Sequence, residues 1–389
     1  MPRPREAGYP SIFTLPPVLG CVALGLFFAL LTAQTTLALL CLLLIALAGT
    51  AKAWSHLSLA RITSELRLSP RRLFPGESLS LAMDIENGKL LPVWLQVSVP
   101  LPASLRTRSG APALRDGGLS SYQALRFDWR ITALARGVHE IGPAQLSAAD
   151  PLGFFPNQKL AAASEVIVYP RLIALHPLAL PRRDLFGKPG VRSPIEDPTY
   201  LNGVRDYQPG RPARHIHWKA SARHARLLEK MCETTESERV LIVLCAEGFD
   251  GPQNADALER CLEVVASLAV QLDHQRHPVG LVTNGRLKGG GANALGMSRT
   301  HGQLSQLLET LARFEPVVER DVIEMLSGAA LLSATVSVVS ASHSLAATPL
   351  LFEYLRQRRV PTVKLVSQCQ ERDLTAGQVV RLNDLRGAP

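Results

Sequence analysis

The residues best equipped for chemistry lie in one basic segment, Arg205–Lys230, which reads RDYQPGRPARHIHWKASARHARLLEK. Its arginines and lysines suit phosphates or carboxylates, and its histidines suit metal binding or proton transfer near neutral pH. His215 and His217 would share one face of a strand, and Trp218 follows them directly. These residue types predict one of four things: a metal site, a nucleic-acid surface, an enzyme's anion clamp or a structural docking element.

The first three alternatives make different demands on the chain. A histidine metal site needs acidic or thiolate companions, and only the sequence neighbours Cys232 and Glu233 are close by. Nucleic-acid binding would use Tyr207 and Trp218 as stacking platforms, and its affinity would fall steeply with salt. A phosphoester hydrolase would bind its anion with four side chains of the segment: Arg205, His215, His217 and Arg223.

The fourth alternative, which we favour, is structural. Pro209 and Gly210 are turn formers, and the alternating His-Ile-His-Trp predicts a strand that buries its apolar side chains, including Trp218. Arg205 and Asp206 would form ion pairs with a neighbouring β domain, and the tryptophan would fill the seam between domains. The segment would then shape a domain junction and present a cationic docking face to a protein partner.

The composition of the whole chain sets the frame for this segment. Its 389 residues exceed what one hydrophobic core usually organises, so at least two folded domains are expected. A formal net charge of +9 accompanies 47% hydrophobic and 19% charged residues, which excludes a basic disordered chain. The six cysteines form no CxxC pair, a pattern typical of reduced thiols in a cytoplasmic domain.

An uncharged stretch from Ser11 to Ala51 predicts a membrane anchor. It is about twice as long as the roughly 20 residues that one helix needs to cross the hydrocarbon, and the polar residues 32–36 interrupt it. We expect an N-terminal segment, 1–60, with two transmembrane helices at about 12–31 and 36–54. Basic residues flank both sides, which places both ends, and the soluble domains, in the cytoplasm.

Two soluble regions follow with different hydrophobic patterns. Residues 61–170 alternate apolar and polar side chains in short runs separated by turn signals, which predicts an immunoglobulin-like β-sandwich. Residues 171–238 form a junction that contains the basic segment. Residues 239–389 alternate apolar strands with helical stretches at 255–274, 303–314 and 348–359, which predicts a doubly wound α/β domain. No phosphate-binding glycine loop follows its first strand, so a nucleotide cofactor is not expected.

Three motifs carry a family resemblance: the basic segment, DPLGFF at 150–155 and ARG at 135–137. With the order of elements above, the chain resembles the bacterial domain-of-unknown-function family fifty-eight, whose members are membrane-anchored relatives of von Willebrand factor A domains. Arg211 and Pro212 stand where that family usually has two acidic residues, and His217 stands where it usually has Asp. The matching motif positions are Arg205, Tyr207, Pro209, Gly210, Arg214, Ile216, Trp218, Lys219, Ala222 and Arg223.

The resemblance also bears on metal binding and on partners. Cys245, Glu247 and Phe249 occupy the positions of the Asp-x-Ser-x-Ser cation ligands of von Willebrand A domains. A thiol and a phenyl ring do not suit a hard cation, so we expect a degenerate site without metal. The resemblance implies neither cofactor nor catalysis, and it implies a partnership with a MoxR-type AAA+ ATPase.

We therefore expect a scaffold or adaptor that is anchored in the bacterial inner (plasma) membrane and acts in the assembly or chaperone-like maturation of other proteins. Nucleic acid is not an expected partner. The alternatives are the phosphoester hydrolase and a membrane-tethered nucleic-acid binder. The partner-binding positions would be Arg205, Asp206, Tyr207, Pro209, Gly210, Arg214, Trp218, Lys219 and Arg223.

Overall fold

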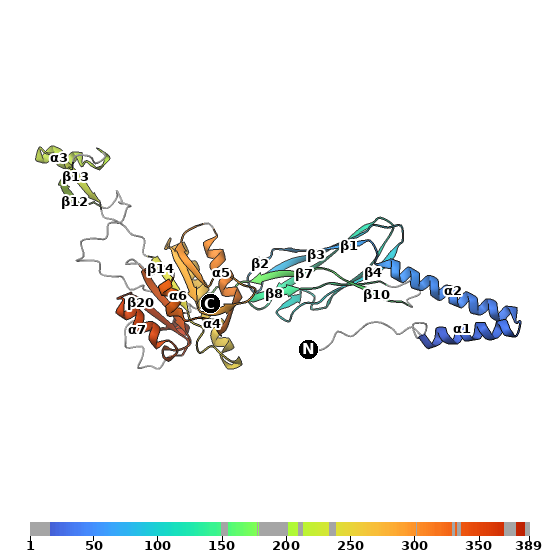
Figure 1. The fold of residues 1–389 in the computed structure, drawn as a ribbon. Coiled ribbons are helices and arrows are strands. Elements are labelled where there is room, and N and C mark those ends of the chain that lie inside the picture. The colour runs from blue at the N-terminus through green and yellow to red at the C-terminus, as the bar shows by residue number, and fades with distance from the viewer. Residues whose placement is uncertain are drawn as a thin grey trace. The chain divides into compact units, whose positions relative to one another are not determined.

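A computed structural model of the chain describes residues 16–148, 155–176, 178, 201–208, 213–232, 239–300, 302–328, 331–332, 336–368 and 379–385 (Figure 1). The chain divides into two compact units, Met1–Arg171 and Leu172–Pro389. The first unit contains an apolar helix pair and a β domain. The second contains the basic segment and an α/β domain.

The N-terminal unit begins with two helices, α1 (Pro16–Leu31) and α2 (Thr35–Ser58), which pack against each other. The polar break predicted at 32–36 is the turn between them, where Thr32 Oγ1 donates to the Phe28 carbonyl at 2.9 Å. Helix α2 runs four residues past its predicted end at 54 and places Lys52 inside the helix. The predicted apolar hairpin is confirmed.

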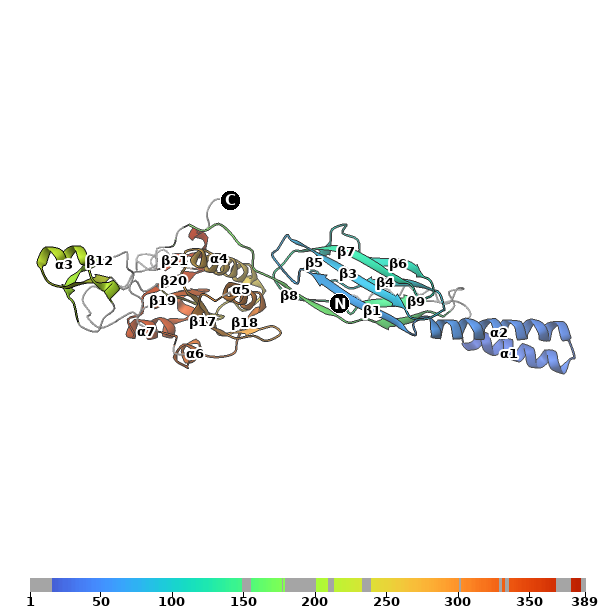
Figure 2. The ribbon, with the colours of Figure 1, turned by 90° about the horizontal axis from the view of Figure 1, so that it is seen from above.

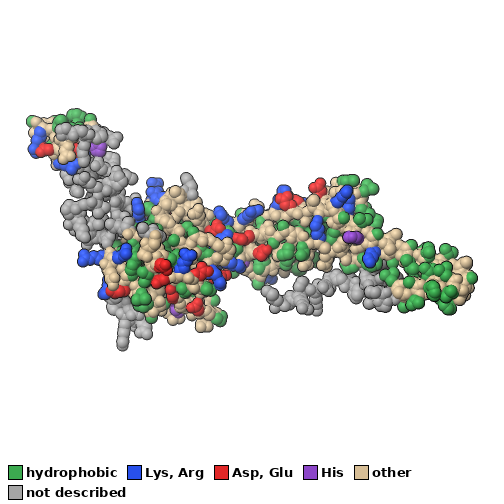
Figure 3. Space-filling model, in the orientation of Figure 1, with side chains coloured by type: hydrophobic (Ala, Val, Ile, Leu, Met, Phe, Trp, Pro, Cys, Tyr) green, Lys and Arg blue, Asp and Glu red, His purple; other side chains and the backbone are tan. Residues whose placement is uncertain are grey.

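Hydrophobic side chains cover the outer surface of this helix pair (Figure 3). Phe27 and Phe28 of α1 are 61% and 63% exposed, a surface that suits lipid better than water. The 24 residues of α2 span about 36 Å, enough to cross the hydrocarbon of a bilayer. Among the described helices α2 alone meets this requirement, and the 16 residues of α1 fall short of it. One candidate membrane span is therefore established, and the second remains a prediction.

The β domain holds the end of α2 with lysine and asparagine side chains. The ammonium of Lys89 donates to the carbonyls of Leu57, Ser58 and Ala60, which the last helical turn leaves without helical partners. Partial burial and the nearby Lys159 ammonium lower the pKa of Lys89. Two further side chains bind the same junction: Asn157 Nδ2 donates to the Ser55 carbonyl at 3.0 Å, and Lys159 Nζ donates to the Ile62 carbonyl at 2.6 Å.

The β domain is built from three sheets. The first has the order β1 (Ile62–Ser69), β3 (Ser78–Asn87), β7 (Ala124–Ala133), β5 (Leu105–Thr107). The second has the order β10 (Asn157–Leu160), β9 (Gln145–Ala148), β4 (Val93–Val99), β6 (Ala113–Leu119). A smaller sheet joins β2 (Arg72–Leu73), β11 (Ser164–Val168) and β8 (Gly137–Ile141).

Side chains from the two larger sheets share one core. Leu81 and Met83 of β3 are fully buried, and so are Leu95 and Val97 of β4. Because side chains alternate across a strand, these i and i+2 pairs form the inner face of each sheet. The predicted alternation is confirmed, and the chain has a layered β domain between its helix pair and Arg171. The DPLGFF motif falls outside the described residues except for Phe155.

The α/β domain is organised around a six-stranded sheet. Its order is β17 (Ala294–Ser298), β15 (Val279–Thr283), β14 (Arg239–Leu244), β19 (Val336–Ser342), β20 (Thr362–Val366), β21 (Val379–Arg381). Strand β17 is antiparallel to β15, and the other neighbours are parallel. The chain starts at β14, adds strands on one side and then continues from β19 on the other. The sheet therefore changes direction between β14 and β19, which is the place where open α/β sheets bind ligands.

Helices cover both faces of this sheet (Figure 2). Helix α4 (Ala255–His274) packs against α5 (Gln303–Arg313) on one face, and its predicted apolar stripe, Leu258 to Leu272, is buried. On the other face, α6 (Val322–Gly328) and α7 (Pro349–Gln357) share a core with Leu241 and Val243 of β14. A separate two-stranded sheet pairs β16 (Gly285–Leu287) with β18 (Phe314–Val318). In the chain, β16 lies between α4 and α5, and β18 lies between α5 and α6. The predicted parallel sheet and its three helices are confirmed.

Candidate functional site

The basic segment folds into a small unit of its own. Strands β12 (Leu201–Asp206) and β13 (Leu228–Cys232) form an antiparallel pair, and between them lie a short turn of 3-10 helix, η2 (Ala213–His215), and helix α3 (Trp218–His224). The Tyr207 amide donates to the Leu227 carbonyl at 2.9 Å and extends the pairing beyond the strand ends. Residues far apart in the segment are therefore brought together.

Arg205 forms an ion pair across this hairpin. The pairing register places Arg205 directly opposite Glu229, and its guanidinium binds the Glu229 carboxylate. The Glu229 side chain is fully buried and that of Arg205 is 39% exposed. Asp206 pairs with Arg226 at 3.2 Å, and both of those side chains are exposed. The expected ion pairs with the β domain are wrong, because hairpin register provides nearer partners.

The strand predicted at His-Ile-His-Trp is also wrong. Ile216 makes a single bridge to Glu229, and a helix starts two residues later. His217 is the N-cap of that helix, and its Nδ1 accepts from the Ala220 amide at 3.1 Å. The family's usual Asp is a favoured residue at this position, and the imidazole nitrogen replaces its carboxylate. Alanines in the segment then favour the helix over a strand.

Ser221 connects α3 to the hairpin, a role that the sequence analysis missed. Its hydroxyl is buried, donates to the His217 carbonyl at 3.0 Å and accepts from the Leu228 amide at 2.9 Å. Ile216 is buried beside it, at 6% exposure. The sequence signal for this contact is the serine that starts Ser-Ala-Arg, residues 221–223, in the basic segment. Part of the basic segment therefore builds its own fold.

The other half of the motif faces outward on α3. Trp218 is 65% exposed, so the prediction that it is buried in a seam is wrong. Lys219, Ala222 and Arg223 are exposed as well. Their spacing makes Ala222 a neighbour of Trp218, and Arg223 a neighbour of Lys219, on the helix surface. We call Trp218, Lys219, Ala222 and Arg223 the α3 face. It combines a large apolar ring with two cations.

The other predicted positions of the segment contribute less to this picture. Tyr207 is half-buried beside the hairpin. Pro209 and Gly210 lie outside the described residues, and Arg214 belongs to η2 although its side chain is not among those described. Of the four groups assigned to a hydrolase, Arg205 is engaged with Glu229 and His217 caps α3.

The second candidate region follows β14, where a metal site would lie in von Willebrand A domains. Cys245 is fully buried in the core that α6 and α7 share, and this burial raises the pKa of its thiol. Phe249 is 1% exposed, and its ring packs edge-on against His343 with 5.3 Å between centroids. Neither side chain reaches the surface. Gly248 has a φ of 81°, a value that favours glycine, and it lets the loop bury Phe249 two residues after Glu247.

Glu247 is the one oxygen donor of the three positions. Its Oε1 accepts from Asn284 Nδ2 at 2.6 Å, and Asn284 Oδ1 accepts from the Ala246 amide at 2.8 Å. The Glu247 Oε2 atom is buried and has no hydrogen-bond partner. Asn284 was not predicted, and its signal in the sequence is a polar residue directly after the apolar strand β15. A replacement contact for the lost ligands therefore exists, and it is made by Glu247 with Asn284.

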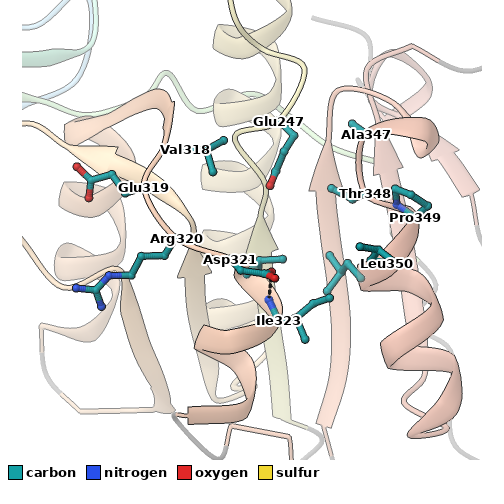
Figure 4. A pocket seen from close by; sticks show the side chains of 12 residues that line it. Glu247, Val318, Glu319, Arg320, Asp321, Ile323, Ala347, Thr348, Pro349 and Leu350 are labelled. Carbon is teal, nitrogen blue, oxygen red and sulfur yellow. Dashed lines mark hydrogen bonds between the residues drawn. The ribbon is translucent and has the colours of Figure 1, made fainter.

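Glu247 lines a pocket of about 430 Å³ at the carboxyl ends of the strands (Figure 4). The other walls come from 318–323, which runs from the end of β18 into the first turn of α6, and from 347–351, which runs into the first turn of α7. Asp321 Oδ1 in this pocket accepts from the Ile323 amide at 2.9 Å. Thr348 is 5% exposed, and its hydroxyl has no hydrogen-bond partner. The pocket lies where the sheet changes direction, as expected for an open α/β sheet.

A metal centre has no complete ligand set in the parts of the chain that the structure describes. No group of three or more His, Cys, Asp or Glu side chains within them lies close enough to hold an ion. His215 and His217, the pair considered for a metal, lie in η2 and at the N-cap of α3. The expectation that the degenerate site binds no metal stays a prediction.

The fold and these two regions define a class: a chain with an N-terminal apolar helix pair, a β domain and an α/β domain that carries the basic segment. Residues 203–384 match the model of the family "Protein of unknown function DUF58", which supports the family assignment. The match begins in β12 and ends in η6 (Leu382–Leu385), so it includes the basic segment and the α/β sheet. The family prediction is confirmed.

Individual relatives add little about function. The chain is 23% identical over 228 residues to the uncharacterized protein YeaD of Bacillus subtilis strain 168. The alignment covers 57% of this chain and 56% of YeaD. The chain thus spans about half the length of this curated relative. An Escherichia coli alpha-2-macroglobulin structure matches 31% of this chain and 20% of its own, at 23% identity and a TM-score of 0.24. A FixG-related protein of Vibrio parahaemolyticus matches 28% of this chain and 96% of its own, at 10% identity and a TM-score of 0.20. Similarities this low carry no argument about fold or function.

Proposed function

We propose that this protein is a non-catalytic adaptor, anchored in the bacterial inner membrane, that docks a protein partner on the α3 face. The β domain would be an immunoglobulin-like spacer and the α/β domain a degenerate von Willebrand A domain. Support for the second assignment comes from the strand order, with its start at β14, its continuation from β19 and its antiparallel edge strand β17. Two membrane helices and cytoplasmic soluble domains belong to this proposal.

The observation that carries the proposal is the exposure of Trp218. A tryptophan with 65% of its surface in water suits a binding anchor, because Trp and Arg are enriched among the residues that dominate binding energy. The exposed cations Lys219 and Arg223 lie on the same helix, on one side of Trp218. The fold of the segment does not need these three side chains, since Ile216, Ser221 and Glu229 build its interior. These three side chains are therefore available to bind a partner.

The charge of the α3 face indicates which kind of partner surface would be complementary to it. Two cations beside an indole ring suit an acidic surface with an apolar groove. The family resemblance supplies the class of partner, a MoxR-type AAA+ ATPase. The adaptor would hold this ATPase at the membrane during assembly or maturation of other proteins.

The test measures binding of the detergent-solubilised full chain to the purified MoxR-type ATPase of the same organism. Trp218→Ala should weaken the complex by about 2 kcal/mol, or roughly 30-fold, as expected of a central anchor. Arg223→Glu should weaken it further, and added salt should reduce affinity because exposed charges are screened.

Trp94→Ala is the matched control, because Trp94 on β4 of the β domain is also 65% exposed. The proposal requires that this change leaves binding intact. Equal losses for the two tryptophan variants would indicate non-specific adhesion. No binding by the wild-type chain would remove the ATPase as the partner.

A further inference from the structure

The floor of the pocket beside Glu247 carries two polar atoms without partners. Glu247 Oε2 is one, and Thr348 Oγ1 is the other. Folded proteins rarely leave buried polar atoms without hydrogen bonds, and such atoms call for an explanation such as an absent ligand. Both side chains line the pocket, and Figure 4 shows Glu247 at its upper centre and Thr348 on the side formed by residues 347–350.

Thr348 has an unusual position for a free hydroxyl. It is the N-cap of α7, where a threonine hydroxyl normally accepts from a backbone amide of the first turn. Here the side chain makes no such bond, although Thr348 is only 5% exposed. The hydroxyl therefore has neither its cap bond nor another hydrogen-bond partner, and Thr348 lines the pocket.

Glu247 has an equally specific setting. Asn284 Nδ2 donates to its Oε1 at 2.6 Å, the buried Oε2 has no hydrogen-bond partner, and the side chain lines the pocket. The Asp321 carboxylate lies in the same space, while Figure 4 shows the guanidinium of Arg320 directed away from Glu247. Glu247 and Asp321 thus lie around the centre of the pocket, whereas the side chains of Glu319 and Arg320 extend away from it (Figure 4).

The mouth of the pocket is apolar. Leu350 is 71% exposed and Val318 is 47% exposed, and both line the pocket together with Pro349. An apolar mouth above an acidic floor suits a side chain with an aliphatic stem and a cationic head. The volume of about 430 Å³ holds such a side chain with part of its backbone.

We propose that this pocket binds a lysine or arginine side chain of a protein partner. Glu247 Oε2 accepts a hydrogen bond from the cationic head, with Thr348 Oγ1 as a second acceptor and Asp321 as a nearby countercharge. Leu350 and Val318 pack on the stem. This site goes beyond the adaptor proposal, because it does not use the α3 face and it defines a second recognition element in the α/β domain.

The test uses fluorescein-labelled peptides and the detergent-solubilised full chain, with binding followed by fluorescence anisotropy. One peptide carries a central lysine between leucines, the second carries norleucine in its place and the third carries glutamate. The lysine peptide should bind at least tenfold more tightly than the other two. The norleucine peptide has a stem of similar length, so it isolates the contribution of the charge.

Variants of the protein locate the binding. Glu247→Gln keeps the acceptor for Asn284 and should weaken lysine-peptide binding at least tenfold, and Thr348→Val should weaken it severalfold. Glu324→Gln is the matched control, since Glu324 is an exposed acid on α6 that does not line the pocket, and it should have no effect. Unchanged thermal melting of each variant shows that the fold is retained.

Several outcomes would overturn the proposal. Equal affinity for the lysine and norleucine peptides would show that the pocket binds only apolar side chains. Preference for the glutamate peptide would show that the pocket selects an anion and not a cation. Binding of Mg²⁺ in calorimetry that Glu247→Gln abolishes would assign the site to a cation. Trp218→Ala should leave peptide binding unchanged, so that failure of this proposal and failure of the adaptor proposal are distinguishable.

Discussion

Replacing Arg205 with methionine should loosen the β12–β13 hairpin selectively. The change removes the guanidinium that binds the buried Glu229 carboxylate and keeps a side chain of similar length. Loss of one partner of a fully buried pair costs about 3–5 kcal/mol, whereas an exposed pair contributes about 0–1 kcal/mol. Arg205 is 39% exposed and Glu229 is 0% exposed, which places this pair between the two limits. We expect a loss of about 2 kcal/mol, or roughly 30-fold in the opening equilibrium.

Hydrogen exchange of the detergent-solubilised chain measures this opening locally. The Tyr207 and Leu228 amides are the reporters, because they donate to the Leu227 carbonyl and to Ser221 Oγ, each at 2.9 Å. Both should exchange about 30-fold faster in Arg205→Met. Peptides from α4 should exchange at the wild-type rate, since the change is confined to the hairpin.

The same hairpin provides a matched control. Arg226 pairs with Asp206, and their side chains are 63% and 68% exposed. Arg226→Met should therefore accelerate exchange about twofold or less. Equal acceleration by the two arginine variants would refute the reasoning that burial of Glu229 sets the strength of the pair.

Three further predictions concern other contacts. His217→Asp should slow hydrogen exchange of the Ala220 amide severalfold, because carboxylates are better N-caps than imidazole. His217→Ala should speed this exchange, because alanine has no side-chain acceptor. Equal exchange rates in the two variants would contradict the role of His217 as a cap. Burial raises the pKa of the Cys245 thiol, so iodoacetamide at about pH 8 should label it only after unfolding. A raised folded-state pKa also means that stability is complete below the unfolded thiol's pKa and is lost as pH rises above it, so Cys245→Ala should flatten the fall in melting temperature above about pH 9. Lys89→Met should destabilise the junction with α2 by about 1–2 kcal/mol, measured by thermal melting, whereas Lys52→Met on the exposed surface of α2 should not.

Hydrophobic periodicity was sufficient to predict most of the elements. The stripe from Leu258 to Leu272 repeats every three or four residues, and the structure has α4 there at the predicted bounds. The alternation in VWLQVSV likewise became β4, with every second side chain buried. These patterns are local, and burial of one face is enough to select the element. Helix α2 ran longer than predicted because side chains of the β domain hold its last carbonyls, which no local pattern reveals.

The basic segment resisted prediction for a different reason. Alternating His-Ile-His-Trp satisfies a strand pattern, but the His217 cap and the alanines that follow it direct the chain into α3. The partner of Arg205 could not be identified either, because Glu229 lies 24 residues away and only the hairpin register brings the two together. Short motifs are therefore poor guides to element type when a single cap decides between two patterns.

The pocket was beyond the reach of sequence reasoning. Its floor combines Glu247, after β14, with Thr348, before α7, and its third wall comes from the loop before α6. The general rule for open α/β sheets predicted the edge of the sheet where ligands bind. Which side chains meet there depends on loop conformations, and no periodicity encodes them. Glu247 was noted only as a replaced metal ligand, and Thr348 only as the start of a predicted helix.

The bonds from Lys89 and Asn157 to the end of α2, and from Lys159 to the start of β1, couple the helix mechanically to the β domain. A domain on a flexible linker samples orientations independently of the helix that carries it. Here the carbonyls around the junction are held by the β domain itself, so a tilt of α2 rotates that domain with it. Helix tilt responds to the match between hydrophobic length and bilayer thickness. Bilayer thickness would thus become a mechanical input to the orientation of the β domain.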